Sequence, residues 1–215
     1  MIFSDRRQAG RKLGEALGAR PGSLVLGIPR GGVVVAAEAA PVVHGTLDVI
    51  VPRKLGAPVN PELGLGAVAA DGTTVLDERL MRVLGVSEGY LRDEVARQVE
   101  EIRRREEIYR AGRPPLDVAG TECIVVDDGV ATGGTAEVAL RSLKRQGARS
   151  VVLAVPVAPR ESLGRLGAVA EEIVCLETPE PFSAVGQWYD SFPQVTDEEV
   201  LEALRDGVGQ ANGTK

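Results

Sequence analysis

The sequence predicts an α/β fold in which helices cover both faces of a parallel sheet. Short and continuously apolar runs, such as residues 24–28 and 151–157, recur along the chain. Such runs are typical of strands that are buried on both faces. Segments with helical spacing separate them, as in repeated strand-helix-strand units. With 215 residues, 44% of them hydrophobic, the chain can form one domain with a sizeable core.

The first elements are expected to alternate regularly. A helix over residues 4–18 has Ser4 as its N-cap. A strand over 24–28 is followed by a Pro-Arg-Gly-Gly turn and an Ala/Val-rich helix that ends near residue 40. The second strand covers residues 47–51.

The next segment is expected to be less regular. Residues 55–66 are rich in Gly and Pro and are predicted to form a loop. Residues 67–70 and 73–76 flank Asp71-Gly72, a dipeptide favoured in tight hairpin turns. A long charged helix over residues 87–109 follows.

The second half of the chain returns to alternation. Its expected elements are a strand over 123–126, a helix over 133–146 closed by Gly147, a strand over 151–157, a helix over 161–170, a strand over 172–176 and a tail helix over 196–204. The tail helix begins with a Thr-x-x-Glu capping box formed by Thr196 and Glu199.

Composition excludes several classes of protein. With 31 acidic and 25 basic residues, the net charge of −6 argues against a protein that coats nucleic acid. Cys123 and Cys175 lie in apolar runs without CxxC spacing, which predicts buried thiols in a reducing compartment. No run of about 18 apolar residues and no signal-peptide pattern occurs, so we expect a cytoplasmic protein without a membrane partner.

The segment after the strand over 123–126 carries the most chemical information. Asp127 and Asp128 precede the sequence Gly-Val-Ala-Thr-Gly-Gly-Thr, which opens a helix. Backbone N–H groups at a helix N-terminus bind anions, and glycines let the backbone approach a ligand closely. An ordinary glycine-rich turn is the alternative. Two carboxylates would repel a phosphate unless they serve another part of the same ligand, such as ribose hydroxyls or metal-bound water.

This segment resembles the signature of the type I phosphoribosyltransferase family, an apolar strand followed by two acids and a small-residue loop. The resemblance implies a Rossmann-like sheet and a site for 5-phosphoribosyl 1-diphosphate (PRPP). Asp127 and Asp128 would hold the ribose 2- and 3-hydroxyls and contact Mg²⁺ indirectly, through ribose or water. The 5-phosphate would be cradled by Ala131, Thr132, Gly133, Gly134 and Thr135. The small Ala131 is similar to the adenine and orotate branches, whereas the hypoxanthine-guanine branch carries an acid there.

Two further segments fit the family pattern. Arg30, Gly31 and Gly32 match its diphosphate loop, which often contains a strained peptide bond, although alone they would indicate a plain turn. Arg53 and Lys54 resemble cations that meet the diphosphate in the orotate branch, although a cation pair at a strand end is usually just solvated. The segment that follows, about residues 55–76, would form a flexible lid.

Aromatic residues are scarce, at 3% of the chain, and four of the seven lie between Phe182 and Phe192. They form either a small packing cluster or part of a C-terminal hood, about residues 178–205, that stacks a flat heterocycle. Trp188 and Tyr189 are the candidate base contacts. The family resemblance covers about residues 20–180, so it gives no information about the role of the aromatic segment.

These observations predict a single domain over residues 1–215 that acts as a phosphoribosyltransferase. It would transfer the phosphoribosyl group of PRPP to a nucleobase, with a purine slightly favoured, and release diphosphate. Asp127, Asp128, Arg53 and Lys54 are the candidate catalytic residues, Mg²⁺ is the cofactor, and a homodimer serving nucleotide salvage is expected. The rival functions are a non-catalytic regulator that senses PRPP and binds RNA or DNA, and a bare nucleotide-binding module. The sequence leaves open the acceptor base, the oligomeric state and the lid conformation.

Overall fold

A five-stranded parallel sheet forms the centre of the protein. The structure, a computed structural model, describes residues 3–115 and 117–211. The strands lie in the order β2 (Thr46–Val49), β1 (Leu24–Gly27), β6 (Glu122–Val126), β7 (Ser150–Val157) and β8 (Glu172–Glu177). Every neighbouring pair is parallel. The predicted α/β fold is therefore confirmed.

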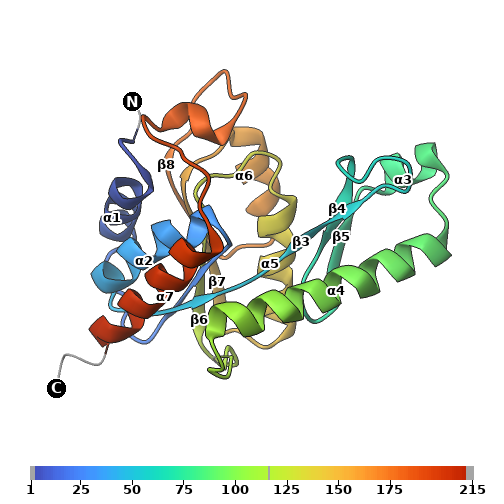
Figure 1. The fold of residues 1–215 in the computed structure, drawn as a ribbon. Helices are drawn as coiled ribbons and strands as arrows, with labels where there is room; N and C mark the ends of the chain where they lie inside the picture. Colours follow the sequence, from blue (N-terminus) through green and yellow to red (C-terminus); the bar gives the residue numbers. More distant parts are fainter. Residues whose placement is uncertain (1–2, 116, 212–215) are drawn as a thin grey trace.

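Helices cover both faces of this sheet (Figure 1). One face carries α1 (Arg6–Leu17), α2 (Gly31–Val43) and α7 (Asp197–Ala211), and the other carries α5 (Gly134–Arg145) and α6 (Arg160–Leu166). Side chains of β6 alternate between the two cores: Ile124 packs with residues of α2 and α7, and Val125 packs with residues of α5 and α6. Burial on both sides is the reason that the strands are continuously apolar.

A second sheet and two helices project from the core as an arm, defined here as residues 53–110 (Figure 1). The arm contains the antiparallel strands β3 (Arg53–Gly56), β4 (Gly64–Val68) and β5 (Thr74–Leu76), and the helices α3 (Glu78–Leu84) and α4 (Glu88–Arg110). The predicted hairpin is confirmed, because β4 pairs with β5 and Gly72 of the turn has φ +80°. Helix α3 has no counterpart among the expected elements.

The expected loop over residues 55–66 is confirmed only in its middle, because residues at both of its ends belong to β3 and β4. Leu55 and Leu65 are fully buried. Gly66 has φ +150°, and a Cβ on it would lie 2.0 Å from the carbonyl oxygen of Val75. At Gly66, therefore, the glycine serves close strand pairing rather than a loop. Residues 57–63 connect the two strands.

Of the two predicted N-terminal helix caps, the cap of α1 is wrong and the capping box of α7 is confirmed. The N-cap of α1 is Asp5, whose carboxylate accepts a 2.7 Å hydrogen bond from the Gln8 N–H, and not Ser4. The capping box of α7 is confirmed by a 3.2 Å bond from the Glu199 N–H to Thr196 and a 2.7 Å bond in the reverse direction. Helix α7 runs beyond the predicted end and packs against α2 and β2, so the last part of the proposed hood belongs to the core face.

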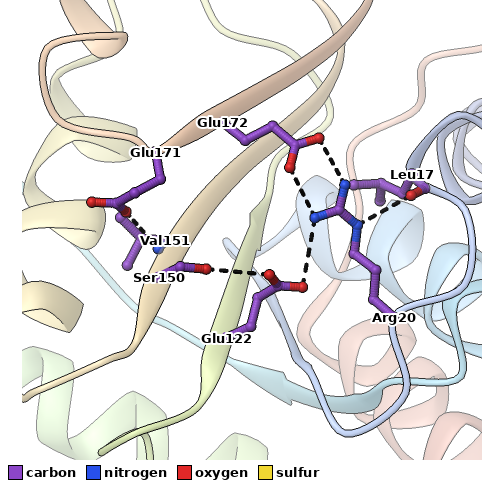
Figure 2. A network of polar contacts seen from close by, with 7 residues as sticks. All are labelled: Leu17, Arg20, Glu122, Ser150, Val151, Glu171 and Glu172. Atoms are coloured by element: carbon purple, nitrogen blue, oxygen red, sulfur yellow. Dashed lines mark hydrogen bonds and ion pairs between the residues drawn. The ribbon is translucent and has the colours of Figure 1, made fainter.

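An ion-pair network fastens the edge of the sheet where the strands begin (Figure 2). Arg20, in the loop before β1, binds Glu172 through two hydrogen bonds of 2.7 and 2.9 Å and lies 3.6 Å from Glu122. Ser150 donates a 3.2 Å bond to Glu122, so the starts of β6, β7 and β8 are joined. The hydrogen bonds from Arg20 hold the pKa of Glu172 below its usual value.

The described residues include no helix that is long and apolar enough to cross a membrane. Cys123 is buried as expected, whereas Cys175 is partly exposed. Burial raises the pKa of both thiols to about 11, which keeps them protonated and unreactive.

Candidate functional site

The two loops singled out in the sequence meet at the carboxyl edge of the sheet. β1 and β6 are adjacent, so the loops that follow them leave the sheet side by side. A Cβ on Gly31 would lie 1.9 Å from Oδ2 of Asp128, and one on Gly32 would lie 2.8 Å from Cα of Asp127. Glycine at both positions therefore permits the contact between the loops. The peptide bond between Pro29 and Arg30 is cis.

The two carboxylates differ in their surroundings. Asp127 accepts a 2.8 Å hydrogen bond from the backbone N–H of Asp128. Its enclosure, and then the adjacent charge of Asp128, raise the pKa of Asp127 well above 3.8. Asp128 accepts a 2.7 Å charge-assisted bond on Oδ2 from Nε of Arg6. One carboxylate is therefore paired with a cation, while its neighbour retains a proton to higher pH.

The small-residue loop is fixed from behind by α6. Ser162 donates a 2.6 Å hydrogen bond to the carbonyl of Ala131, and the guanidinium of Arg165 donates to the carbonyl of Thr132. Gly133 has φ +80° at the start of α5. Within residues 3–115 and 117–211, the N–H groups of residues 131–133 donate to no partner. These N–H groups, together with the dipole of α5, form a site suited to a phosphate.

The loop after β1 carries an available cation. Arg30 precedes the first residue of α2 and is half-buried. Its guanidinium forms no ion pair with any described residue. Gly32 is buried beneath the loop, against the carbonyl oxygen of Val126. A guanidinium beside a helix N-terminus can bind an anion through charge-assisted hydrogen bonds.

The arm supplies two more cations. Nε of Arg53 donates a 3.0 Å hydrogen bond to Gln98 on α4, and Gln98 donates a 2.9 Å bond to the buried Glu94. Partial burial, and then the nearby Arg105, lower the pKa of Arg53. Lys54 is exposed.

A cleft of about 440 Å³ connects these cations to the phosphate loop. Its walls include Arg53, Lys54 and Glu62 from the arm, and Thr135 from the first turn of α5. Arg30, Asp127 and Asp128 do not line this cleft. The structure therefore brings the arm cations to the α5 end of the site, while the diphosphate loop and the two carboxylates meet beside it.

Tyr189 and Trp188 have different environments. Tyr189 is 6% exposed, and its ring packs between Phe3 and Phe192 with centroid distances of 5.5 and 4.9 Å. Its hydroxyl donates a 2.5 Å hydrogen bond to the carbonyl of Asp128. Tyr189 thus presents no free ring face to a base. It belongs to a packing cluster, which was one of the two possibilities for these aromatic residues. Trp188 is half-buried and stacks on Phe182, and its role as a base contact stays a prediction.

Comparison with known proteins agrees with this geometry. The profile of the phosphoribosyl transferase domain matches residues 15–187. The chain belongs to the phosphoribosyl transferase family. It is similar to a Mycobacterium tuberculosis protein provisionally named phosphoribosyl transferase, with 43% identity over 205 residues. That match covers 94% of this chain and 46% of the mycobacterial protein, so the chain spans about half the length of that relative.

Two further similarities extend the comparison. The crystal structure of the TT1426 protein of Thermus thermophilus superposes with a TM-score of 0.80 at 48% identity, covering 95% of this chain and 98% of that chain. A uracil phosphoribosyltransferase of Exiguobacterium sibiricum is 34% identical over 105 residues, which is 49% of this chain and 48% of that enzyme.

The phosphoribosyl transferase domain offers a metal ion few protein ligands. The described residues contain no group of three or more His, Cys, Asp or Glu side chains that could hold a metal. Asp127 and Asp128 alone fit a Mg²⁺ ion that keeps several waters and takes other ligands from the substrate phosphates. The indirect contact with Mg²⁺ that the family resemblance implies stays a prediction.

Several supporting residues of the phosphoribosyl transferase site escaped prediction. Three of them contact the site only because the fold brings distant segments together, and no motif around them in the sequence indicates a role. These are Ser162, Arg165 and Gln98. Arg6 does carry a local signal. It lies in the first turn of α1, where the helix dipole disfavours a cation, so an arginine there indicates a partner outside the helix.

Proposed function

We propose that this domain transfers the 5-phosphoribosyl group of PRPP to a ring nitrogen of a nucleobase and releases diphosphate. The observation that supports this most directly is the meeting of the two loops after β1 and β6. That meeting brings the loop that carries Arg30, whose guanidinium pairs with no described residue, against Asp127 and Asp128. In PRPP the diphosphate is attached to the ribose next to its hydroxyls, so the two adjacent loops are suited to bind both parts of one molecule.

The proposed chemistry is a displacement at the anomeric carbon. The bond from this carbon to the diphosphate oxygen breaks while the bond to the acceptor nitrogen forms, so positive charge grows on the sugar and negative charge on the diphosphate. The base gives up its N–H proton to the released diphosphate or to water. Asp127 and Asp128 accept hydrogen bonds from the ribose hydroxyls and orient the ring. Arg30, with the N–H groups of Gly31 and Gly32, binds the diphosphate.

Closure of the arm would bring Arg53 and Lys54 from the α5 end of the site to the leaving diphosphate, whose charge they stabilise. Arg53 and Lys54 line the cleft beside Thr135, and the N–H groups at residues 131–135 anchor the 5-phosphate. When bound, Mg²⁺ supplies further neutralisation of the diphosphate. Closure of the arm over this cleft would exclude water from the reactive sugar.

The acceptor class rests on two observations that point in different directions. Ala131 favours a purine slightly, by resemblance to the adenine branch, whereas the Exiguobacterium relative acts on uracil by its name. We therefore propose a nucleobase, with Trp188 as its candidate contact. The proposal includes a homodimer, a cytoplasmic location and a role in nucleotide salvage.

An assay of diphosphate release tests the function. The protein is incubated with Mg²⁺, PRPP and, in separate reactions, adenine, guanine, hypoxanthine, uracil or orotate. Release with one base is expected, and it identifies the acceptor. Calorimetric binding of PRPP without release in any reaction would instead support the PRPP-sensing regulator. The absence of both would contradict the proposal.

Substitutions in the loop test the site. Asp128→Asn combined with Thr132→Ala removes one ribose acceptor and one phosphate donor, so we expect PRPP affinity to fall by more than about 100-fold. Asp93→Asn, at an exposed position on α4, is the matched control and should bind as the wild type does. Unchanged calorimetric affinity in the double variant would contradict the assignment of this loop.

A further inference from the structure

We propose that Arg6 is a positioning residue, which fixes the carboxylate of Asp128 so that one of its oxygens faces the ribose. The inference rests on the proposed function and adds a residue to its site. Arg6 lies on α1, far from the loop in the sequence, yet its guanidinium touches the loop directly.

The guanidinium of Arg6 is held on three sides. Its Nε donates a 2.7 Å bond to Asp128, one terminal nitrogen donates a 2.8 Å bond to the carbonyl of Pro193, and its Cζ lies over the ring of Phe192, 3.7 Å from the ring centroid. The side chain is 9% exposed. An exposed ion pair is mobile and weakly coupled, whereas this arginine has a single defined geometry.

The contacts leave Asp128 with one free acceptor. Oδ2 faces Arg6 and lies against Gly31, where even a Cβ would not fit. The backbone carbonyl of the same residue accepts the hydroxyl of Tyr189 at 2.5 Å. Among the described residues, Oδ1 accepts no hydrogen bond from an N–H group or a hydroxyl, although the Asp127 carboxyl lies in side-chain contact with Asp128; Oδ1 is not among the buried unpartnered atoms. Oδ1 is therefore the oxygen available to a ribose hydroxyl.

The charge of Arg6 also suits a ligand that bears phosphates. Asp127 and Asp128 together would repel such a ligand, and Arg6 places a positive charge on the inner side of Asp128. The same charge acts against the rise in the pKa of Asp127 that its enclosure causes. Arg6 thus orients the carboxylate of Asp128 and offsets part of the negative charge of the pair.

Arg6 and the residues that hold it, apart from Asp128, lie outside the segment that the family profile matches. The family profile covers residues 15–187, whereas Arg6 precedes it and Phe192 and Pro193 follow it. The aromatic segment after β8 thereby has a function other than base stacking. It fixes Arg6, and Arg6 in turn orients the Asp128 carboxylate that is proposed to bind the ribose.

The alternative is that Arg6 only fastens the two ends of the domain. Three variants separate the two roles, with affinity for PRPP measured by calorimetry in Mg²⁺ and with kcat and KM measured where turnover is found. Arg6→Gln should raise Kd and KM for PRPP at least tenfold, and Arg6→Lys, which keeps the charge but not the three contacts, should raise them several-fold. Arg7→Gln removes a 63% exposed neighbour that pairs with Glu38, and it should stay within twofold of the wild type.

A fourth variant controls for stability. Arg20→Gln breaks the ion pairs at the opposite edge of the sheet, so it should lower Tm while Kd stays within threefold of the wild-type value. Equal losses of affinity in Arg20→Gln and Arg6→Gln at matched Tm would overturn the positioning role. So would folded Arg6→Gln and Arg6→Lys proteins that bind PRPP as the wild type does. Failure of the wild type itself to bind PRPP would instead overturn the proposed function, and this inference with it.

Discussion

At the scale of single residues, Asp127 has a consequence that can be measured without a substrate. Its pKa is raised in the folded protein, so between about 3.8 and that raised value the folded chain holds a proton that the unfolded chain has lost. Folding stability therefore falls as the pH rises through this window. Asp127→Asn removes the effect, and its amide oxygen can still accept the N–H of Asp128.

We expect Asp127→Asn to match the wild type near pH 4 and to be the more stable protein at pH 7.5. The difference in the free energy of unfolding amounts to about 1.4 kcal/mol for each unit by which the pKa is raised. Urea unfolding across this pH range measures it. A wild-type protein that gains stability relative to the variant as the pH rises would contradict the assigned direction.

The residues of the site were predictable where the signal is local. Asp127 and Asp128 directly follow a buried strand and precede the glycines of the same loop, so adjacency alone indicates shared chemistry. Arg6 was not predictable in this way, because its contact with Asp128 spans 122 positions of the sequence. The burial of Tyr189 was not predictable for a related reason. Its ring packs on Phe3 and its hydroxyl binds the carbonyl of Asp128, and both residues are distant from it in the sequence.

At the scale of elements, α4 orients the cation that β3 presents. The hydrogen bond of Gln98 to Arg53 is the link, and Gln98→Ala removes it. We expect kcat to fall about tenfold while Kd for PRPP changes less than threefold, since Arg53 is proposed to stabilise charge that grows on the leaving diphosphate.

Tyr90→Phe is the matched control for the arm. It deletes a 2.9 Å bond from α4 to the carbonyl of Gly56 and leaves Arg53 in place. Its expected cost is about 1 kcal/mol of stability with an unchanged kcat. Equal losses of kcat in both variants would show that arm rigidity, and not the direction of Arg53, controls turnover.

Strands of the parallel sheet were predictable because both of their faces are buried, which leaves an unambiguous apolar run. The arm was harder because its strands are short and contain glycines at crowded positions such as Gly66. Helix α3 has no buried residue, so it lacks the apolar face from which a helix is normally inferred.

At the scale of the whole molecule, the site follows the carboxyl ends of β1 and β6, whereas the Arg20 network joins the starts of the strands, at the opposite edge of the same sheet. Arg20→Gln should therefore lower stability without altering affinity for PRPP. The expected loss is about 1 kcal/mol, because Glu172 is 45% exposed and solvent screens the pair. The pKa of Glu172 is lowered by folding, so its contribution is present above 4.5 and is lost as the pH falls below that value.

Thermal unfolding at pH 7 and pH 3, paired with PRPP calorimetry at pH 7, tests this separation. The Tm difference between wild type and Arg20→Gln should shrink at pH 3. A weaker affinity for PRPP in this variant would mean that the two edges are coupled through the strands.

The segments that flank the common domain also bear on how the protein is made. Phe3 exchanges 2.8 Å backbone hydrogen bonds with Trp188 and Asp190, and the N–H of Ser191 reaches Ser4 at 2.9 Å. A nascent chain that has reached residue 187 contains the whole phosphate loop but none of Tyr189, Phe192 and Pro193. Asp128 can take its final orientation only after these residues have left the ribosome, so competence to bind the ribose would arise late in synthesis.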